Sequence, residues 1–175
     1  MTYQITRQIE LDAGHRIPDH KGQCFNLHGH RYKVEVAVSR FTLDDHGPER
    51  GMIMDYGGLK DIMMEKIHKV CDHKMMLYVH DPILNHMIDE DQLKEIQRIL
   101  DARRRTPFID VLTTKMIPIV QKLVIFAKVP TAENLAAAWY DSVCDPIEDA
   151  TGALPDYLRV WETPNVTATY LSLMK

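Results

Sequence analysis

The sequence contains few cysteines: Cys24, Cys71 and Cys144 lie far apart in a chain of 175 residues. An odd, small number at wide spacing does not make a disulfide framework. No two of them have the Cys-x-x-Cys spacing of a structural zinc site. The first residues also lack the apolar core of a signal peptide. We therefore expect a reducing compartment and a cytoplasmic protein.

Long hydrophobic runs and an excess of positive charge are also missing. No apolar run approaches the roughly 20 residues that a membrane-spanning helix needs, so we expect no membrane partner. The net charge is −4, and nucleic-acid binding usually requires a basic face. The one short basic run, residues 103–105, follows a helical pattern and suits a helix C-terminus. With 45% hydrophobic and 26% charged residues, the composition predicts a single globular domain over residues 1–175.

Hydrophobic periodicity predicts an α+β protein. Strands are expected at residues 3–11, 31–39, 52–56, 122–129, 157–162 and 166–173. Helices are expected at residues 59–70, 89–105 and 135–143, the last with Thr131 as its N-cap and with an end or kink at Asp145-Pro146 or Thr151-Gly152. Residues 15–30 predict a loop, and Thr163-Pro164-Asn165 predicts a hairpin turn. Hairpin-like neighbours favour an antiparallel sheet with helices on one face.

The loop carries a pattern that is typical of a metal site. His28 and His30 are one residue apart, so both imidazoles point to the same side of an extended chain. His15, upstream in the sequence, can complete a set of three. Three imidazoles hold a zinc ion and leave its fourth position open, which separates a catalytic zinc from a structural one. Three solvated loop histidines are the ordinary alternative.

Cys24, four residues before His28, has two possible roles. As a fourth ligand it would close the zinc site, and as a nucleophile or general base it would act on a substrate. Asp72-His73, at the end of a predicted helix, favours the second role because such a pair can move protons. Glu162, at the end of an apolar strand, can accept paired hydrogen bonds from the edge of a pterin or guanine. Taken singly, Asp72-His73 is more typical of an ordinary helix end, and Glu162 is more typical of a surface residue at the end of a strand.

The ordered set of motifs resembles one family. It comprises Ala13-Gly14-His15-Arg16, Cys24-x3-His28-Gly29-His30, Met54-Asp55-Tyr56, Cys71-Asp72-His73, Pro130-Thr131-Ala132-Glu133-Asn134-Leu135, and Trp161-Glu162-Thr163 followed by Val166-Thr167-Ala168-Thr169-Tyr170. The sequence is similar to the 6-pyruvoyltetrahydropterin synthase / 6-carboxytetrahydropterin synthase family over most of residues 3–80 and 123–174. Each motif alone is weak, but the order of all six is specific.

The resemblance implies the tunnelling fold (T-fold), with a four-stranded antiparallel sheet and two helices on one face. It implies homo-oligomers, usually hexamers, with sites between subunits. It also implies residue roles: zinc on His15, His28 and His30; Cys24 as the proton-abstracting thiolate; Asp72 and His73 as the acid/base pair; and Glu162 as the pterin anchor with Thr131 nearby. From their charge and loop position, Arg16 and Lys21 are expected to contact phosphate.

The spacing between Cys24 and His28 resembles that of the queuosine-pathway branch of this family. This implies a zinc-dependent lyase that converts 7,8-dihydroneopterin triphosphate to 6-carboxy-5,6,7,8-tetrahydropterin and releases acetaldehyde and triphosphate. One alternative is a 6-pyruvoyltetrahydropterin synthase, which only eliminates triphosphate. An alternative of another class is a non-catalytic, zinc-stabilised pterin-binding oligomer in which Cys24 is a ligand.

The sequence departs from the family at residues 81–122, where a helical insertion is expected. Typical members pass from the Asp-His motif to the Pro-Thr motif in far fewer residues. The insertion could cap the substrate mouth, extend the oligomer interface or bind a partner. A surface excursion without catalytic consequence is an equal alternative.

Overall fold

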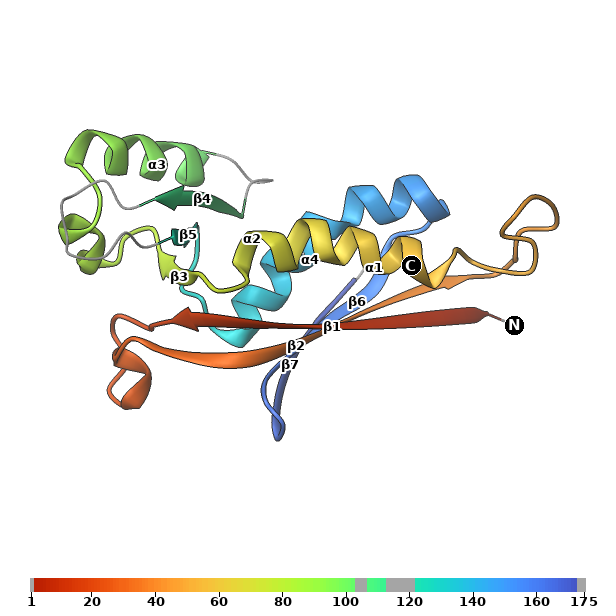
Figure 1. Cartoon of the computed structure of the whole chain (residues 1–175), viewed down its shortest axis with the longest axis horizontal. Coiled ribbons are helices and arrows are strands. Elements are labelled where there is room, and N and C mark those ends of the chain that lie inside the picture. The colour runs from red at the N-terminus through yellow and green to blue at the C-terminus, as the bar shows by residue number, and fades with distance from the viewer. Residues whose placement is uncertain (1, 103–106, 113–121, 173–175) are drawn as a thin grey trace.

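The computed structural model describes residues 2–102, 107–112 and 122–172. Its strands form one seven-stranded sheet in the order β4-β5-β3-β1-β2-β6-β7 (Figure 1). Their bounds are β1 (Tyr3–His15), β2 (His28–Arg40), β3 (Met75–Tyr78), β4 (Phe108–Leu112), β5 (Lys122–Phe126), β6 (Pro155–Thr163) and β7 (Val166–Leu171). The helices are α1 (Tyr56–Met63), α2 (Lys69–Cys71), α3 (Glu90–Ala102) and α4 (Ala132–Thr151).

The sheet is mixed, so the expectation of a four-stranded, wholly antiparallel sheet was wrong. β1, β2, β6 and β7 do form a contiguous antiparallel unit. Three further strands extend it, because β3 pairs in parallel with the end of β1 and with β5, and β4 pairs antiparallel with β5. β3 was missed because four residues are too few to display a period of two.

The expected short strand at residues 52–56 was also wrong. Ile53 and Met54 are buried, but they lie in bends that lead into α1, after Gly51 at φ +82°. These two residues are apolar because they pack against the core, and not because they pair in a strand. The expected loop at residues 15–30 is shorter than predicted, since β1 runs to His15 and β2 begins at His28. Between them lies a short 3-10 helix, η1 (Gln23–Phe25).

The three predicted helices are present, and the first of them contains a π-helical segment. The helix expected at residues 59–70 is continuous from α1 to α2 through a π-helical segment, η2 (Met64–His68). Thr131 caps α4, accepting a hydrogen bond from Asn134 N at 3.4 Å. α4 continues past Pro146 to Thr151 and ends at Gly152 in the left-handed region. Val143 and Ile147 are fully buried on either side of Pro146, and their packing offsets the hydrogen bond that proline cannot donate.

The core has two parts. The larger lies between the sheet and the helices of one face, α1, α2 and α4, and is centred on Trp139 and Tyr32 (Figure 1). The smaller lies around α3, β3, β4 and β5. None of the helices among the described residues has the length and apolar character to cross a membrane.

The segment expected as a helical insertion at residues 81–122 contains a strand as well as helices. A 3-10 helix, η3 (Pro82–His86), leads to α3, and β4 then joins the sheet beside β5. The helix expected at residues 89–105 is confirmed over Glu90–Ala102. The basic run at residues 103–105 lies outside the described residues.

Candidate active site

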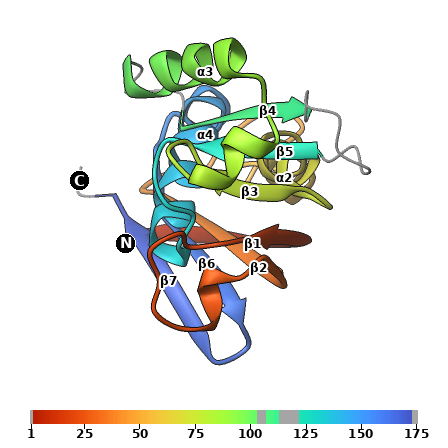
Figure 2. The same cartoon turned by 90° about the vertical axis from the view of Figure 1, so that its left-hand side faces the viewer.

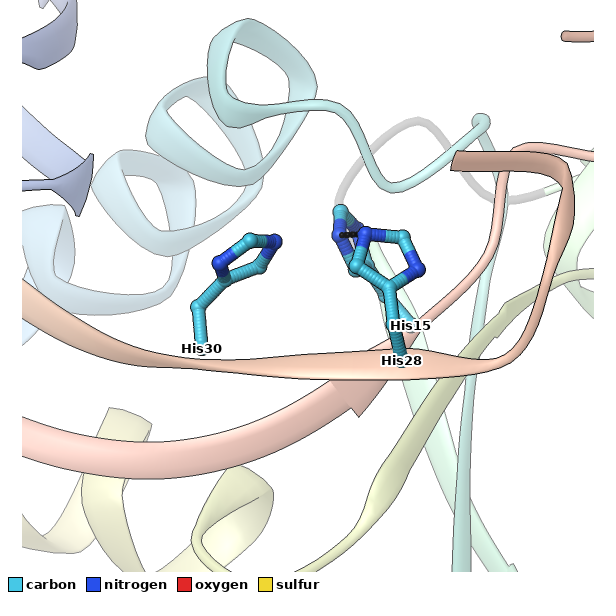
Figure 3. Close-up of side chains that lie close together, drawn as sticks. All are labelled: His15, His28 and His30. Carbon is cyan, nitrogen blue, oxygen red and sulfur yellow. Dashed lines mark hydrogen bonds between the residues drawn. The ribbon is translucent and has the colours of Figure 1, made fainter. Parts of the chain in front are cut away.

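Two neighbouring strands bring the three predicted histidines together. His15 is the last residue of β1 and lies directly opposite His28, the first residue of β2. His30 follows two residues later on the same face of β2. The ring centroids lie 4.5 Å apart for His15 and His28, 5.0 Å for His28 and His30, and 5.2 Å for His15 and His30. Figure 3 shows the three rings converging from the two strands.

Backbone carbonyls fix the tautomers of two of these rings. His15 Nδ1 donates to Pro130 O at 2.8 Å, and His28 Nδ1 donates to Asn26 O at 2.8 Å. The two Nε2 atoms then face each other 3.1 Å apart. With Nδ1 protonated on both rings, each Nε2 presents a lone pair to the other, and a cation between them removes that conflict. A tetrahedral zinc with Zn–N bonds of about 2.0–2.1 Å would separate two such nitrogens by about 3.3 Å.

Burial keeps these imidazoles in the form that binds metal. Desolvation lowers the pKa of His15 below the ordinary value of 6.5, and the hydrogen bond to Pro130 and the Glu162 carboxylate only partly oppose it. Desolvation also lowers the pKa of His30. Metal ligands must be neutral imidazoles, so the shifts favour metal binding at neutral pH. The donor set therefore fits zinc.

Glu162 lies against the histidines rather than apart from them. Its Oε1 atom is 3.3 Å from His15 Nε2 and 3.7 Å from His30 Nε2. β6 carries it there, because Trp161 pairs with Lys33 of β2. The carboxylate adds a negative charge beside nitrogen lone pairs, which makes the site more attractive to a cation. Its side chain remains 23% exposed, so it can also reach a ligand at the mouth of the site.

Cys24 lies outside the group of metal-binding atoms. Among the described residues, the three histidines form the one group whose ligand atoms all lie within 4.8 Å of one another. Cys24 is half-buried on η1, and its carbonyl accepts from Ile17 N at 2.8 Å. Within one chain this arrangement favours the role of base or nucleophile over the role of fourth ligand.

Asp72 and His73 form a hydrogen-bonded pair directly after α2. His73 Nδ1 donates to Asp72 Oδ2 at 2.7 Å, while Asp72 Oδ1 accepts from Asp12 N at 3.0 Å. Desolvation acts to raise the pKa of Asp72, but these hydrogen bonds outweigh it and the pKa falls below 3.8. The anionic carboxylate fixes the tautomer of His73, leaving Nε2 on a side chain that is 78% exposed.

The pair does not touch the histidine cluster within the chain. Over the described residues, no hydrogen bond or ion pair joins Asp72 or His73 to Cys24 or to the three histidines. His73 and His30 do line the same open depression, which has a volume of about 460 Å³. The chain alone therefore brings together the three predicted metal ligands and Glu162, and leaves the predicted acid/base pair outside this group.

The remaining predicted site residues are placed as follows. Thr131 caps α4 next to Pro130, whose carbonyl holds His15. Arg16 is paired with Asp81 at 3.1 Å, and its side chain is only 13% exposed. Lys21 is exposed in the stretch that leads to η1. Contacts of Arg16 and Lys21 with phosphate stay predictions, and the Nε edge of Arg16 is already occupied.

The sequence reasoning missed two residues that shape the site. Tyr32 continues the face of His28 and His30, and its ring lies 6.0 Å from His15 and 5.6 Å from His30. Period-two alternation along β2 was the signal that could have found it. Asp81, which pairs with Arg16, is brought there by the topology and left no local signal beyond the Asp-Pro start of a helical turn.

Three comparisons place these features among known proteins. A family model described as 6-pyruvoyl tetrahydropterin synthase matches residues 4–172. The chain is 29% identical to the 6-carboxy-5,6,7,8-tetrahydropterin synthase of Rickettsia conorii, over 93% of this chain and 95% of that one. It is 28% identical to the enzyme of the same name from Aquifex aeolicus, over 97% and 98% of the two chains.

Solved structures share the fold. An uncharacterized protein from Wolinella succinogenes superposes with a TM-score of 0.72 at 19% identity, covering 98% of this chain and 99% of that one. The 6-pyruvoyl tetrahydropterin synthase of Plasmodium vivax superposes with a TM-score of 0.57 at 16% identity, covering 97% of each chain. The chain therefore has the T-fold, here with its sheet extended by three strands.

Replacing one histidine tests the metal centre. We expect His28→Ala to weaken zinc binding by about two orders of magnitude or more, since loss of an outer-shell partner alone costs about 10–100-fold. Zinc per chain after dialysis, measured by elemental mass spectrometry, checks this. His46→Ala, at a side chain that is 91% exposed, is the matched control and should keep full zinc. Equal zinc in both variants would contradict the site.

The lowered pKa values predict a pH dependence of the metal-free protein. His15 and His30 have folded-state pKa values below the ordinary histidine value of 6.5, so the unfolded chain binds more protons in that range. The free energy of unfolding should therefore fall as pH drops through about 6.5 toward the folded-state values. Asp72, with its pKa lowered from 3.8, acts only in a more acidic window. Urea titrations of the metal-free protein between pH 7.5 and 5 measure this, and a flat or rising profile would contradict it.

Proposed function

The chain belongs to the 6-pyruvoyl tetrahydropterin synthase family, and on this premise we propose that it is a zinc-dependent lyase of the queuosine-pathway branch. It converts 7,8-dihydroneopterin triphosphate and one water to 6-carboxy-5,6,7,8-tetrahydropterin, with release of acetaldehyde and triphosphate. Two observations favour this product: three residues separate Cys24 from His28, and the curated relatives carry the 6-carboxy name. One observation carries the catalytic proposal: the three histidines converge while Cys24 lies outside their group.

The histidines are the residues that hold zinc in this proposal. When bound to His15, His28 and His30, zinc supplies a Lewis acid that lowers the pKa of side-chain hydroxyls on the substrate. The carbonyls of Pro130 and Asn26 keep Nδ1 protonated on His15 and His28, so both Nε2 atoms remain available as donors to the metal. Burial of His15 keeps this part of the site dry.

Cys24 is the residue that removes a proton from the substrate side chain. Its half-buried position on η1 leaves the thiol within reach of a ligand. The other two thiols are poor candidates, because burial raises the pKa of Cys71 to about 12 and that of Cys144 to about 11. Both are therefore protonated at neutral pH, whereas a base must accept a proton at the reacting carbon.

Asp72 and His73 move protons to and from the substrate hydroxyls. The carboxylate accepts a hydrogen bond from Nδ1–H of His73, which leaves Nε2 to accept a proton from the substrate and to return it later. The pair does not touch Cys24 within the chain, so we propose that it meets a neighbouring subunit's site. The unpaired edge of β7, with Val166, Tyr170 and Leu171 exposed, supports assembly into homo-oligomers through sheet edges.

Glu162 is the anchor for the pterin ring. A carboxylate accepts two parallel hydrogen bonds from an amino-pyrimidine edge, and the partly exposed side chain of Glu162 is free to do so. Its distance of 3.3 Å from His15 Nε2 supports binding of the ring next to the metal site. Thr131 borders the same region through its neighbour Pro130.

Product analysis tests the reaction. Purified, zinc-loaded protein is incubated with 7,8-dihydroneopterin triphosphate, and the products are identified by mass. We expect the 6-carboxy product together with acetaldehyde in equal amount. A 6-pyruvoyl product without acetaldehyde would contradict the carboxy assignment and indicate the synthase that only eliminates triphosphate.

Cys24→Ala separates the enzyme from a non-catalytic zinc protein. We expect zinc content to stay at the wild-type level while turnover falls by about 10²–10⁴-fold, the usual contribution of a general base. Cys144→Ala, which removes a thiol on α4, is the matched control and should keep wild-type turnover. Loss of zinc in step with the loss of Cys24, with no turnover by the wild type, would overturn the proposal in favour of Cys24 as a ligand.

A further inference from the structure

The segment after β3 is a packed unit rather than a loose excursion. η3, α3 and β4 enclose their own apolar cluster together with β3 and β5, and Leu84 and Ile88 in it are fully buried. Figure 2 shows this unit above the ends of β1 and β2, on the same end of the molecule as η1. The clustered core fixes where the polar side chains of the unit point.

One carboxylate of this unit holds the residue that follows His15. Asp81 is 1% exposed; its Oδ1 accepts from Ile83 N at 3.0 Å and its Oδ2 lies 3.1 Å from Arg16 Nε. The nitrogen and oxygen are not aligned as a hydrogen bond, so the contact is an ion pair. A buried carboxylate without a cation beside it is costly, and the pair therefore fixes Arg16.

Arg16 in turn holds the stretch that carries Cys24. Its guanidinium carbon lies 4.7 Å from the ring centroid of Phe25, the residue after Cys24. The next residue, Ile17, donates its N–H to Cys24 O at 2.8 Å. η1 has no buried residues of its own, so these contacts with the residues after β1 hold it in position instead of core packing.

A second carboxylate of the unit holds the residue that follows His73. Lys74 is 9% exposed, and its Nζ donates to Asp110 Oδ2 on β4 at 2.5 Å. The backbone of Lys74 also accepts from Gly14 N at 3.0 Å. His73 has φ +56°, a conformation that non-glycine residues adopt only when their surroundings hold them. The ion pair of the buried Lys74 with Asp110 supplies such a constraint on the next residue.

We propose that the unit formed by residues 81–102, residues 107–112 and β5 is a positioning device for the active site. Asp81 and Asp110 are its positioning residues: Asp81 acts through Arg16 on the Cys24 stretch, and Asp110 acts through Lys74 on the Asp72-His73 pair. Each carboxylate binds the cation that directly follows a site histidine in the sequence. The catalytic roles of Cys24 and His73 in this proposal rest on the proposed function. The contacts of Asp81 and Asp110 do not depend on that function.

Asp81→Asn tests the first contact in the zinc-loaded protein. We expect the rate of iodoacetamide labelling at Cys24, read by peptide mass, to rise severalfold because the stretch loosens. Labelling at Cys144 in the same sample is the internal reference and should not change. Zinc per chain should stay at the wild-type level, while kcat falls by about 10–100-fold, as misplacement of a reacting group by about 1 Å does.

Asp110→Asn tests the second contact and separates it from the first. We expect kcat to fall while Cys24 labelling stays at the wild-type rate, because Arg16 is untouched. Asp110 is 54% exposed, so Asp110→Glu has room to reach Lys74 and should restore kcat. Glu95→Gln removes an exposed ion pair with Arg98 on the outer face of α3 and is the control that should change neither readout.

Two outcomes would overturn the inference. One is wild-type labelling at Cys24 in Asp81→Asn together with wild-type kcat. The other is an Asp110→Asn protein with unchanged kcat.

If Asp81→Asn does not fold, Phe25→Leu at a side chain that is 48% exposed should raise Cys24 labelling instead, and an unchanged rate there counts against the proposal. If the wild type turns over no pterin, the proposed function fails, and the labelling contrast still decides the first contact.

Discussion

The site depends on the antiparallel register of β1 and β2. His15 lies opposite His28, and Ala13 opposite His30, so the three imidazoles share the face that also carries Tyr32. A slip of one residue would turn every side chain of β2 to the other face and separate the rings. The register is held along Tyr3–His15 and His28–Arg40, with Leu11, Val34 and Val36 buried beneath α1 and α4. The core thus fixes the geometry of the donors.

The electrostatic environment of the three histidines favours the binding of a cation. Carbonyl acceptors at Pro130 and Asn26 orient two rings, burial keeps His15 and His30 neutral, and Glu162 brings a negative charge to within 4 Å of two nitrogens. The Nε2 lone pairs that face one another repel, and the Glu162 carboxylate beside them adds to this repulsion. A bound cation would relieve both repulsions at once, which is why we propose a metal here, with Cys24 and His73 left for proton transfer in the proposed reaction.

The sequence predicted the candidate site residues because their signal is local and ordered: His-x-His on an alternating strand, Asp-His at a helix end, and Glu at the end of an apolar strand. Helices α1 and α3 followed from their apolar periodicity, and α4 followed from the N-cap signal at Thr131. What it did not predict depends on contacts between distant segments. β3 is too short to show a period, Ile53 and Met54 are buried without being a strand, and the contacts of Asp81 and Asp110 join residues 65 and 36 positions apart. Only the fold brings such pairs together.

The central claim is that three histidine nitrogens bind zinc while Cys24 does not. X-ray absorption at the zinc edge of the loaded wild-type protein tests it most directly. The account predicts a first shell of nitrogen or oxygen neighbours at about 2.0–2.1 Å and no sulfur neighbour. A zinc–sulfur distance of about 2.3 Å that disappears in Cys24→Ala would contradict it, since Cys24 would then be a ligand of a closed site.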